Sequence, residues 1–264
     1  VEVFEKSRGV GGRMSTRKEL PFIFDHGAQF FKIESNDFKN FVAELIAQQI
    51  ICPWKLKLAY FEGDNLKKIK MIQKKHKFYV GVPSMDSIVK YMSKDLCVNL
   101  NTKIERIIKK GDKWYIYDQN KKRHGHYDWI IISLPAEQSL ELIAKTICFH
   151  SLIKKIKMVG CISLMVGLNK SLNLDFDAAL IKNKDIAWLA LNNSKPHRKK
   201  NTCLLINSSY EYAKKNSNSS KIKVQKHLLN ETRNLINSNL SDAELLKVHQ
   251  WKYVKQRIIL LKII

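Results

Sequence analysis

The most informative stretch of this 264-residue chain is Val-Glu-Val-Phe-Glu-Lys-Ser-Arg-Gly-Val-Gly-Gly-Arg-Met at residues 1–14. Its first four residues are mostly β-branched or aromatic and predict a strand, which ends on the carboxylate of Glu5. A glycine-rich turn at residues 7–14 follows directly. A carboxylate that ends a strand near such a turn is typical of a βαβ unit that binds a dinucleotide, where it accepts hydrogen bonds from ribose hydroxyls. The same spacing also fits a surface loop after an edge strand.

Outward from this stretch, the apolar pattern predicts alternating strands and helices. The run of residues 128–133 is largely apolar and is bounded by Pro135, which is typical of a strand buried on both faces of a parallel sheet. Together the elements predict mixed α and β structure in two interleaved parts. Helices are expected at residues 37–49 after an Asn or Asp cap, 84–94, 136–145 and 219–237, and strands at 1–4, 22–24, 56–61, 77–82, 98–100, 103–108, 114–118, 128–133, 159–168, 187–191 and 202–208.

The composition excludes several classes of protein. The chain has 47 Lys+Arg against 24 Asp+Glu and a net charge of +23, yet its basic clusters are spread along the sequence and are mostly Lys. Nucleic-acid readers concentrate their charge and favour Arg, so we expect no specific nucleic-acid partner. No apolar run approaches the roughly 18 residues of a membrane span, and no secretory signal is present. Five widely spaced cysteines without a C-x-x-C pair predict reduced thiols. We therefore expect a cytoplasmic protein with no membrane partner.

Six blocks, read together, carry more information than the glycine turn alone. They are Glu-Lys-Ser-Arg-Gly-Val-Gly-Gly-Arg-Met at 5–14, Asp-His-Gly-Ala-Gln-Phe-Phe at 25–31, Gly-Val-Pro-Ser-Met-Asp-Ser-Ile at 81–88, Ile-Ile-Ile-Ser-Leu-Pro-Ala at 130–136, Ala-Trp-Leu-Ala-Leu-Asn-Asn-Ser-Lys-Pro at 187–196 and His-Gln-Trp-Lys-Tyr at 249–253. In this order, and over nearly the whole chain, they closely resemble the renalase-like branch of the FAD-dependent amine-oxidase superfamily.

The resemblance implies an α/β flavoprotein of two domains. A Rossmann-like FAD-binding domain, discontinuous and incomplete, would comprise residues 1–48 and 81–145. A mixed-sheet substrate domain at residues 49–80 and 146–264 would cover the flavin ring. The family's N-terminal G-x-G-x-x-G unit and C-terminal Gly-Asp segment have no counterpart in this sequence, and we expect the chain to be truncated at both ends.

The resemblance also implies roles for individual residues. Gln29 would lie beside the isoalloxazine, and His249 and Trp251 would approach the substrate side of the ring. Phe30 stands where the family commonly has Tyr, which keeps an aromatic wall and loses a hydroxyl donor. The residues implied to hold FAD are Glu5 at the adenosine ribose, Gly11, Gly12, Arg13 and Met14 at the pyrophosphate and ribityl chain, Gly27 and Ala28 beside the isoalloxazine, Ile104 at the adenine, and Leu134 and Pro135 along the dinucleotide groove.

The reaction implied for the family is hydride transfer from a reduced nitrogen-containing small molecule to the flavin, with O2 as acceptor and H2O2 as product. Isomeric dihydro forms of NAD(P), or an amine, are the implied substrates. The alternative is an inactive remnant that acts at most as a binding module. The sequence leaves the oligomeric state open.

Other candidate sites have a structural and a functional interpretation. His124 and His126 could form a metal pair, but no third ligand is near, so the sequence favours a polar hairpin turn. His26 could bind the backbone or face the flavin. Trp188 and Lys195 could pack the substrate domain or contact substrate.

Overall fold

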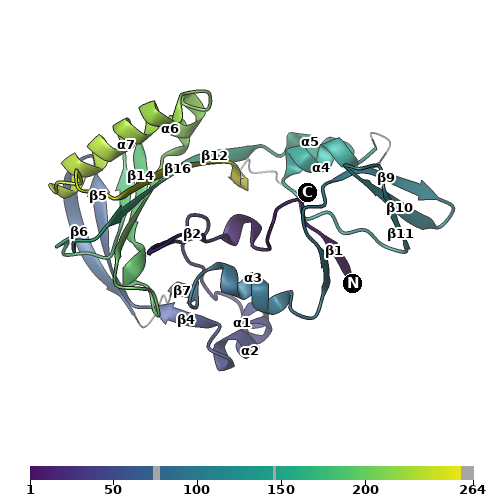
Figure 1. Ribbon diagram of the computed structural model, residues 1–264, viewed down its shortest axis with the longest axis horizontal. Helices are drawn as coiled ribbons and strands as arrows, with labels where there is room; N and C mark the ends of the chain where they lie inside the picture. Colours follow the sequence, from purple (N-terminus) through teal and green to yellow (C-terminus); the bar gives the residue numbers. More distant parts are fainter. Residues whose placement is uncertain (74–77, 145–146, 257–264) are drawn as a thin grey trace. The chain divides into compact units, whose positions relative to one another are not determined.

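The computed structural model describes residues 1–73, 78–144 and 147–256, and these form a mixed α/β chain, as predicted (Figure 1). The chain divides into two compact units. The first consists of Val1–Val10, Asp95–Gly160 and the segment that begins at Lys252, and the second of Gly11–Lys94 and Cys161–Trp251. The limits of the two functional domains given above remain a prediction.

A seven-stranded mixed sheet with the order β16-β12-β15-β14-β13-β5-β6 is the framework of the second unit. Strands β13 and β5 run parallel, whereas β5/β6, β13/β14, β14/β15 and β12/β15 are antiparallel. The predicted strands at 56–61, 159–168, 187–191 and 202–208 are confirmed. The bounds are Leu56–Glu62 for β5, Asn65–Ile72 for β6, Met158–Leu168 for β12, Ala178–Lys182 for β13, Ile186–Leu191 for β14, Thr202–Ser208 for β15 and Leu245–Gln256 for β16.

Two helices cover one face of this sheet (Figure 1). The longer one, α7, starts where the Ser220 hydroxyl accepts a hydrogen bond from the amide of Lys223, and it ends at Asn237 in the left-handed conformation. Its buried residues recur at helical spacing, which confirms the helix predicted at 219–237. The bounds are Tyr210–Lys215 for α6 and Lys221–Ile236 for α7, and the buried apolar residues of α7 are Val224, Leu228 and Leu235.

The opposite face of the sheet packs against two small two-stranded sheets and three short helices. Trp54, Leu56 and Met85 are almost fully buried at this second core. Because both faces of the sheet are covered, the loops that leave it here can hold buried polar groups. The bounds are Arg17–Glu19 for β2, Phe22–Phe24 for β3, Ile51–Trp54 for β4, Phe78–Gly81 for β7, Asn36–Phe41 for α1, Ala43–Ala47 for α2 and Asp86–Met92 for α3.

The helix predicted at 37–49 forms in two pieces, α1 and α2, with a break at Val42. The predicted Asn or Asp cap is wrong: the hydroxyl of Ser35 caps α1 by accepting a hydrogen bond from the amide of Phe38, at 3.2 Å. The side chains of Val42 and Leu45 are buried at the break, so packing of the apolar face, and not continuity of the helix, positions this segment.

The first unit contains a parallel pair of strands, β1 and β8, and a three-stranded antiparallel sheet of order β11-β10-β9. The strands predicted at 1–4, 98–100, 103–108 and 114–118 are confirmed. The bounds are Glu2–Phe4 for β1, Cys97–Asn99 for β8, Ile104–Lys110 for β9, Lys113–Asp118 for β10, Arg123–Tyr127 for β11, Ala136–Leu142 for α4 and His150–Lys155 for α5.

The strand predicted at residues 128–133 is wrong. These residues form no regular structure, and the side chains of Trp129 and Ile131 are 87% and 92% exposed. A strand needs a neighbour to satisfy its backbone hydrogen bonds, and no described strand pairs with this segment. The apolar run indicates that the segment could form a strand beside a partner strand, and here it has no such partner among the described residues.

Candidate functional site

Glu5 lies at the carboxyl ends of the parallel strands β1 and β8, where ligands bind in open α/β sheets. Its amide donates to the carbonyl of Asn99 at 2.9 Å, and its carbonyl accepts from the amide of Thr102 at 2.9 Å. One carboxylate oxygen accepts from the amide of Ser7 at 2.7 Å. These contacts hold a partly exposed carboxylate, an acceptor suited to ribose hydroxyls, at the end of the pair.

The other predicted nucleotide contacts of the first unit lie on separate elements. Ile104 is the half-buried first residue of β9, two residues after Thr102. Leu134 is 41% exposed, and Pro135 precedes the first turn of α4. The hydroxyl of Ser139 donates to the carbonyls of both residues, at 3.1 Å, and so fixes the start of the helix.

The glycine turn has the backbone that its sequence predicts. Gly11 and Gly12 have φ values of 136° and 48°, a region that favours glycine. The amide of Met14 closes the turn by donating to the carbonyl of Gly11 at 2.7 Å. A Cβ atom at Gly9 or Gly12 would meet no atom of the described residues within 4 Å, so these residues leave space beside the backbone. Arg13 is exposed, and Met14 packs on the second core.

The loop at residues 25–29, which follows β3, packs directly against this turn. The amide of Ala28 donates to the carbonyl of Arg13 at 2.8 Å. A Cβ atom on Gly27 would overlap the same carbonyl oxygen, so only glycine fits there. Two blocks that the resemblance assigns to one cofactor are thus joined by backbone contacts within the second unit.

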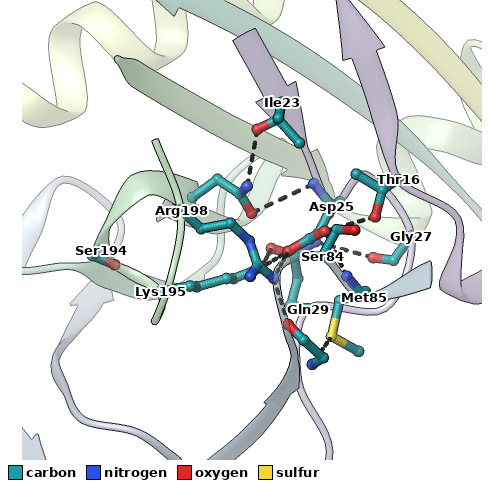
Figure 2. A network of polar contacts seen from close by, with 12 residues as sticks. Thr16, Ile23, Asp25, Gly27, Gln29, Ser84, Met85, Ser194, Lys195 and Arg198 are labelled. Atoms are coloured by element: carbon teal, nitrogen blue, oxygen red, sulfur yellow. Dashed lines mark hydrogen bonds and ion pairs between the residues drawn. The ribbon is translucent and has the colours of Figure 1, made fainter. Parts of the chain in front are cut away.

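Asp25 is the centre of a buried polar cluster (Figure 2). Its Oδ2 accepts from Arg198 Nη2 at 2.7 Å and from Lys195 Nζ at 3.2 Å. Its Oδ1 accepts from the Thr16 hydroxyl at 2.8 Å and from the Met85 amide at 3.0 Å. One carboxylate therefore joins Thr16, just after the glycine turn, to the start of α3 and to the segment that follows β14.

The cluster holds two cations for one anion, and the pKa values reflect this imbalance. Burial alone would raise the pKa of Asp25, but Lys195, Arg198 and the hydrogen bonds outweigh it and lower the pKa to about 2. Burial lowers the pKa of Lys195 to about 8, because the nearby Arg198 also repels its charge and Asp25 offsets this only in part. Two cations stabilise the charged form of Asp25, whereas Lys195 has only one carboxylate beside it and shares that carboxylate with Arg198.

Gln29 and Phe30 are held by the protein itself. The Gln29 amide nitrogen donates to the carbonyl of Gly27 at 3.0 Å and to that of Asp25, and its oxygen accepts from Lys195 Nζ at 3.4 Å. The Phe30 ring stacks on Phe78 with centroids 3.8 Å apart. The Gln29 amide thus orders the 25–29 loop, and Phe30 packs with Phe78 and Trp188 in the second core.

His26 and His249 lie edge to face with ring centroids 4.9 Å apart, and the Trp251 ring is 4.4 Å from His249. Trp251 Nε1 donates to the carbonyl of His26 at 3.0 Å, as does the Ser163 hydroxyl at 3.2 Å. Burial, with the nearby His249 and Arg17, lowers the pKa of His26 to about 4, so its ring is neutral. Burial also lowers the pKa of His249. The structure thus brings the predicted His249 and Trp251 to the 25–29 loop.

The hairpin turn predicted for His124 and His126 is wrong, because both residues lie in strand β11. His124 Nε2 is 2.9 Å from Asp118 Oδ2, and its ring packs against Phe4 with centroids 5.0 Å apart. No group of three metal-ligating side chains occurs within the described residues. The contacts of His124 are those of a strand residue bound to its neighbour.

Sequence reasoning missed most of the buried cluster. The sequence places Asp25 in a loop block without assigning it a role, and Arg198 belongs to the run His197–Lys200, which predicts a solvated basic surface. The Arg198 side chain is 2% exposed in the structure. For Lys195 the sequence leaves packing and substrate contact as alternatives, and its side chain is fully buried in the structure. A polar residue at a strand end beside glycine was the available signal for Asp25.

Residues 1–45 match the family described as the NAD(P)-binding Rossmann-like domain. A protein from Exiguobacterium sp. 255-15, to which a protoporphyrinogen oxidase activity is attributed, matches with a TM-score of 0.79 and 8% identity over 97% of this chain and 81% of that chain. This chain shares its fold. Cyclohexylamine oxidase from Brevibacterium oxydans IH-35A matches with a TM-score of 0.72 and 9% identity over 95% and 79% of the two chains. A CLA-producing fatty acid isomerase from P. acnes matches with a TM-score of 0.70 and 9% identity over 96% and 80%.

These comparisons confirm the predicted fold class, with a Rossmann-like region at the start of the chain. Identities of 8% to 9% establish the fold alone, and the matched proteins include both oxidases and an isomerase. Among the helices that the structure describes, none has the length and apolar character needed to cross a membrane.

The pKa of Lys195 determines the sign of a pH test. Between its folded value of about 8 and its ordinary value of 10.5, the unfolded chain binds more protons than the folded chain. The free energy of unfolding is therefore expected to rise with pH over this range, relative to a Lys195→Met variant. Urea unfolding of both proteins at several pH values checks this. A relative loss of stability with rising pH would mean that Asp25 holds Lys195 charged.

Proposed function

We propose that this chain is an FAD-dependent oxidoreductase of the renalase-like type, which takes a hydride from a reduced nitrogen-containing small molecule and passes the electrons to O2. The contact between Arg13 and Ala28 carries the proposal. It joins the glycine turn to the 25–29 loop, the two blocks that the resemblance assigns to the pyrophosphate and the flavin ring. The match of residues 1–45 to a dinucleotide-binding domain supports the same assignment.

Three observations indicate that the residues present could hold FAD. Glu5 offers a carboxylate oxygen at the carboxyl ends of parallel strands. The turn has open space beside Gly9 and Gly12, where a side chain would otherwise stand. Arg13 supplies a guanidinium suited to a pyrophosphate. As the resemblance implies, we also assign Ile104, Leu134 and Pro135 to the dinucleotide.

FAD, when bound, supplies the acceptor for the hydride. The chain's own side chains bind, orient and exclude water. Phe30 and Phe78 form a stacked aromatic wall that suits a flat heterocyclic substrate. The neutral His26 ring has a buried Nδ1 with no hydrogen-bond partner among the described residues, and it can accept a hydrogen bond from a ligand. His249 lies beside it and can orient a substrate without adding charge.

Replacing Arg13 by Ala is expected to weaken FAD binding by about 1.5 to 3 kcal/mol, the range for a hydrogen bond to a charged group. Titration of the purified chain with FAD, followed by flavin fluorescence, measures the affinity. Lys6→Ala is a matched control, because it removes an exposed cation from the same stretch. Equal affinities for wild type and Arg13→Ala would remove Arg13 from the pyrophosphate.

The substrate class is tested by peroxide formation in the presence of FAD. We expect peroxide with isomeric dihydro forms of NAD(P) and less with simple amines, because the flat aromatic wall matches a heterocycle. Peroxide from amines alone would transfer the proposal to an amine oxidase. A chain that retains no flavin after FAD is added and the excess is removed would favour the alternative of an inactive remnant.

A further inference from the structure

Asp25 does not need Lys195, the second cation of the buried cluster, to satisfy its carboxylate. Without Lys195, this carboxylate already accepts hydrogen bonds from Arg198, Thr16 and Met85 at 2.7, 2.8 and 3.0 Å. The contact with Lys195 is the longest of the four, at 3.2 Å. A carboxylate paired with one guanidinium is balanced in charge, so the buried ammonium adds a desolvation cost that no second anion offsets.

Lys195 nevertheless occupies a prepared position. Its side chain is fully buried, and its ammonium lies 5.3 Å from the centre of the Trp54 ring. The Asn192 side chain fixes the segment that carries it, since Nδ2 donates to the carbonyl of Ile23 at 2.9 Å. The amide of Lys195 donates to the carbonyl of Asn192 at 3.2 Å. The chain thus places a cation behind the 25–29 loop at an energetic cost.

The contact that explains this placement is the one with Gln29. Lys195 Nζ lies 3.4 Å from the Gln29 amide oxygen, while the amide nitrogen binds the carbonyls of Asp25 and Gly27 (Figure 2). The Gln29 side chain therefore spans its own loop, with Lys195 at the far end. Perturbed buried charges of this kind are concentrated at functional sites.

We infer that Lys195 is a positioning residue for the 25–29 loop: it fixes the Gln29 side chain, and through it the backbone at Gly27 and Ala28, and the fold does not need it. The statement that this loop faces the flavin ring rests on the proposed function. The positioning role itself rests on contacts within the second unit.

Hydrogen exchange of the chain without FAD tests the inference. In Lys195→Met, which keeps the length of the side chain and removes the charge, the amide of Ala28 is expected to exchange about tenfold faster or more. Amides of β12 and β15 are expected to keep their rates. Lys195→Arg, which retains a cation, is expected to restore most of the protection. Lys184→Met is the matched control, because Lys184 is partly buried in ion pairs with Asp64 and Glu231 and does not contact the loop.

Unchanged exchange at residues 26–29 in Lys195→Met would overturn the inference. An equal rise in the loop and in the central strands would also overturn it, because Lys195 would then serve the fold as a whole. With FAD added, the absorption band of the bound flavin is expected to change shape in Lys195→Met and not in Lys184→Met. Failure of the wild-type chain to bind FAD would contradict the proposed function alone, since the exchange result decides the role of Lys195.

Discussion

Replacement of Asp25 by Asn is expected to lower the free energy of unfolding by about 3 to 5 kcal/mol, the cost of removing one partner from a buried ion pair. The Asn side chain fills the same space, so the loss comes from charge and not from a cavity. It leaves Lys195 and Arg198 buried beside each other with no anion between them. Denaturant unfolding monitored by tryptophan fluorescence measures the change.

Asp112→Asn is the control for this substitution, because Asp112 is an exposed residue in the turn between β9 and β10. It is expected to change stability by less than about 0.5 kcal/mol.

The effect of Asp25→Asn also depends on pH. The folded pKa of about 2 lies below the ordinary 3.8, so the stabilisation is present above pH 3.8 and is lost as the pH falls toward 2. A loss below about 1 kcal/mol at neutral pH would show that the cluster is solvated.

A double variant separates the two cations. Adding Lys195→Met to Asp25→Asn removes one of the two charges that the first change leaves unpaired, so the effects are not expected to add. The double variant is expected to be more stable than Asp25→Asn alone. If it is less stable by the full effect of each change, Lys195 does not interact with Asp25 in solution.

Replacement of Gly27 by Ala is the second change with a large expected effect, a loss of about 2 to 3 kcal/mol from overpacking against backbone. The new Cβ would overlap the carbonyl of Arg13, and the turn cannot yield without breaking the bond from the Ala28 amide. FAD affinity is expected to fall as well, because both cofactor blocks meet at this contact.

Gly9→Ala serves as the matched control, since its Cβ would meet nothing within 4 Å and its φ lies outside the left-handed region. It is expected to change stability by less than about 0.5 kcal/mol. Thermal unfolding of the two variants gives the comparison. Equal melting temperatures for Gly27→Ala and wild type would show that the loop and the turn are not in contact.

The pattern of apolar residues correctly predicted the helices and strands whose side chains are buried in the core. Continuous apolar runs were enough to predict β12 and β15, and apolar residues at helical spacing were enough for α7, because these side chains form the core. The run at 128–133 has the same composition and forms no strand, because strand formation depends on hydrogen bonds to a neighbour that a pattern cannot supply. The sequence therefore predicts a segment's preference and not its pairing.

The buried cluster could not be predicted from local sequence patterns, because its residues are far apart in the sequence. Asp25 contacts residues 170 and 173 positions away, Lys195 and Arg198, and no spacing rule connects them. Arg198 also stands between basic neighbours that are exposed, so the run gives no sign that one member is buried. The resemblance could align the blocks at 25–31 and 187–196. Only coordinates could show that their charged side chains meet.

The hydrated indole of Trp129 has a practical consequence. An indole that is 87% exposed is expected to emit at long wavelength, whereas Trp54 and Trp188 are surrounded by apolar side chains. Any chain that aligns beside residues 129–133 would dry this indole and shift its emission to the blue. Trp129 and Ile131 both expose large apolar side chains, so self-association in concentrated solutions is expected to begin at this segment, and the Trp129 emission would report it.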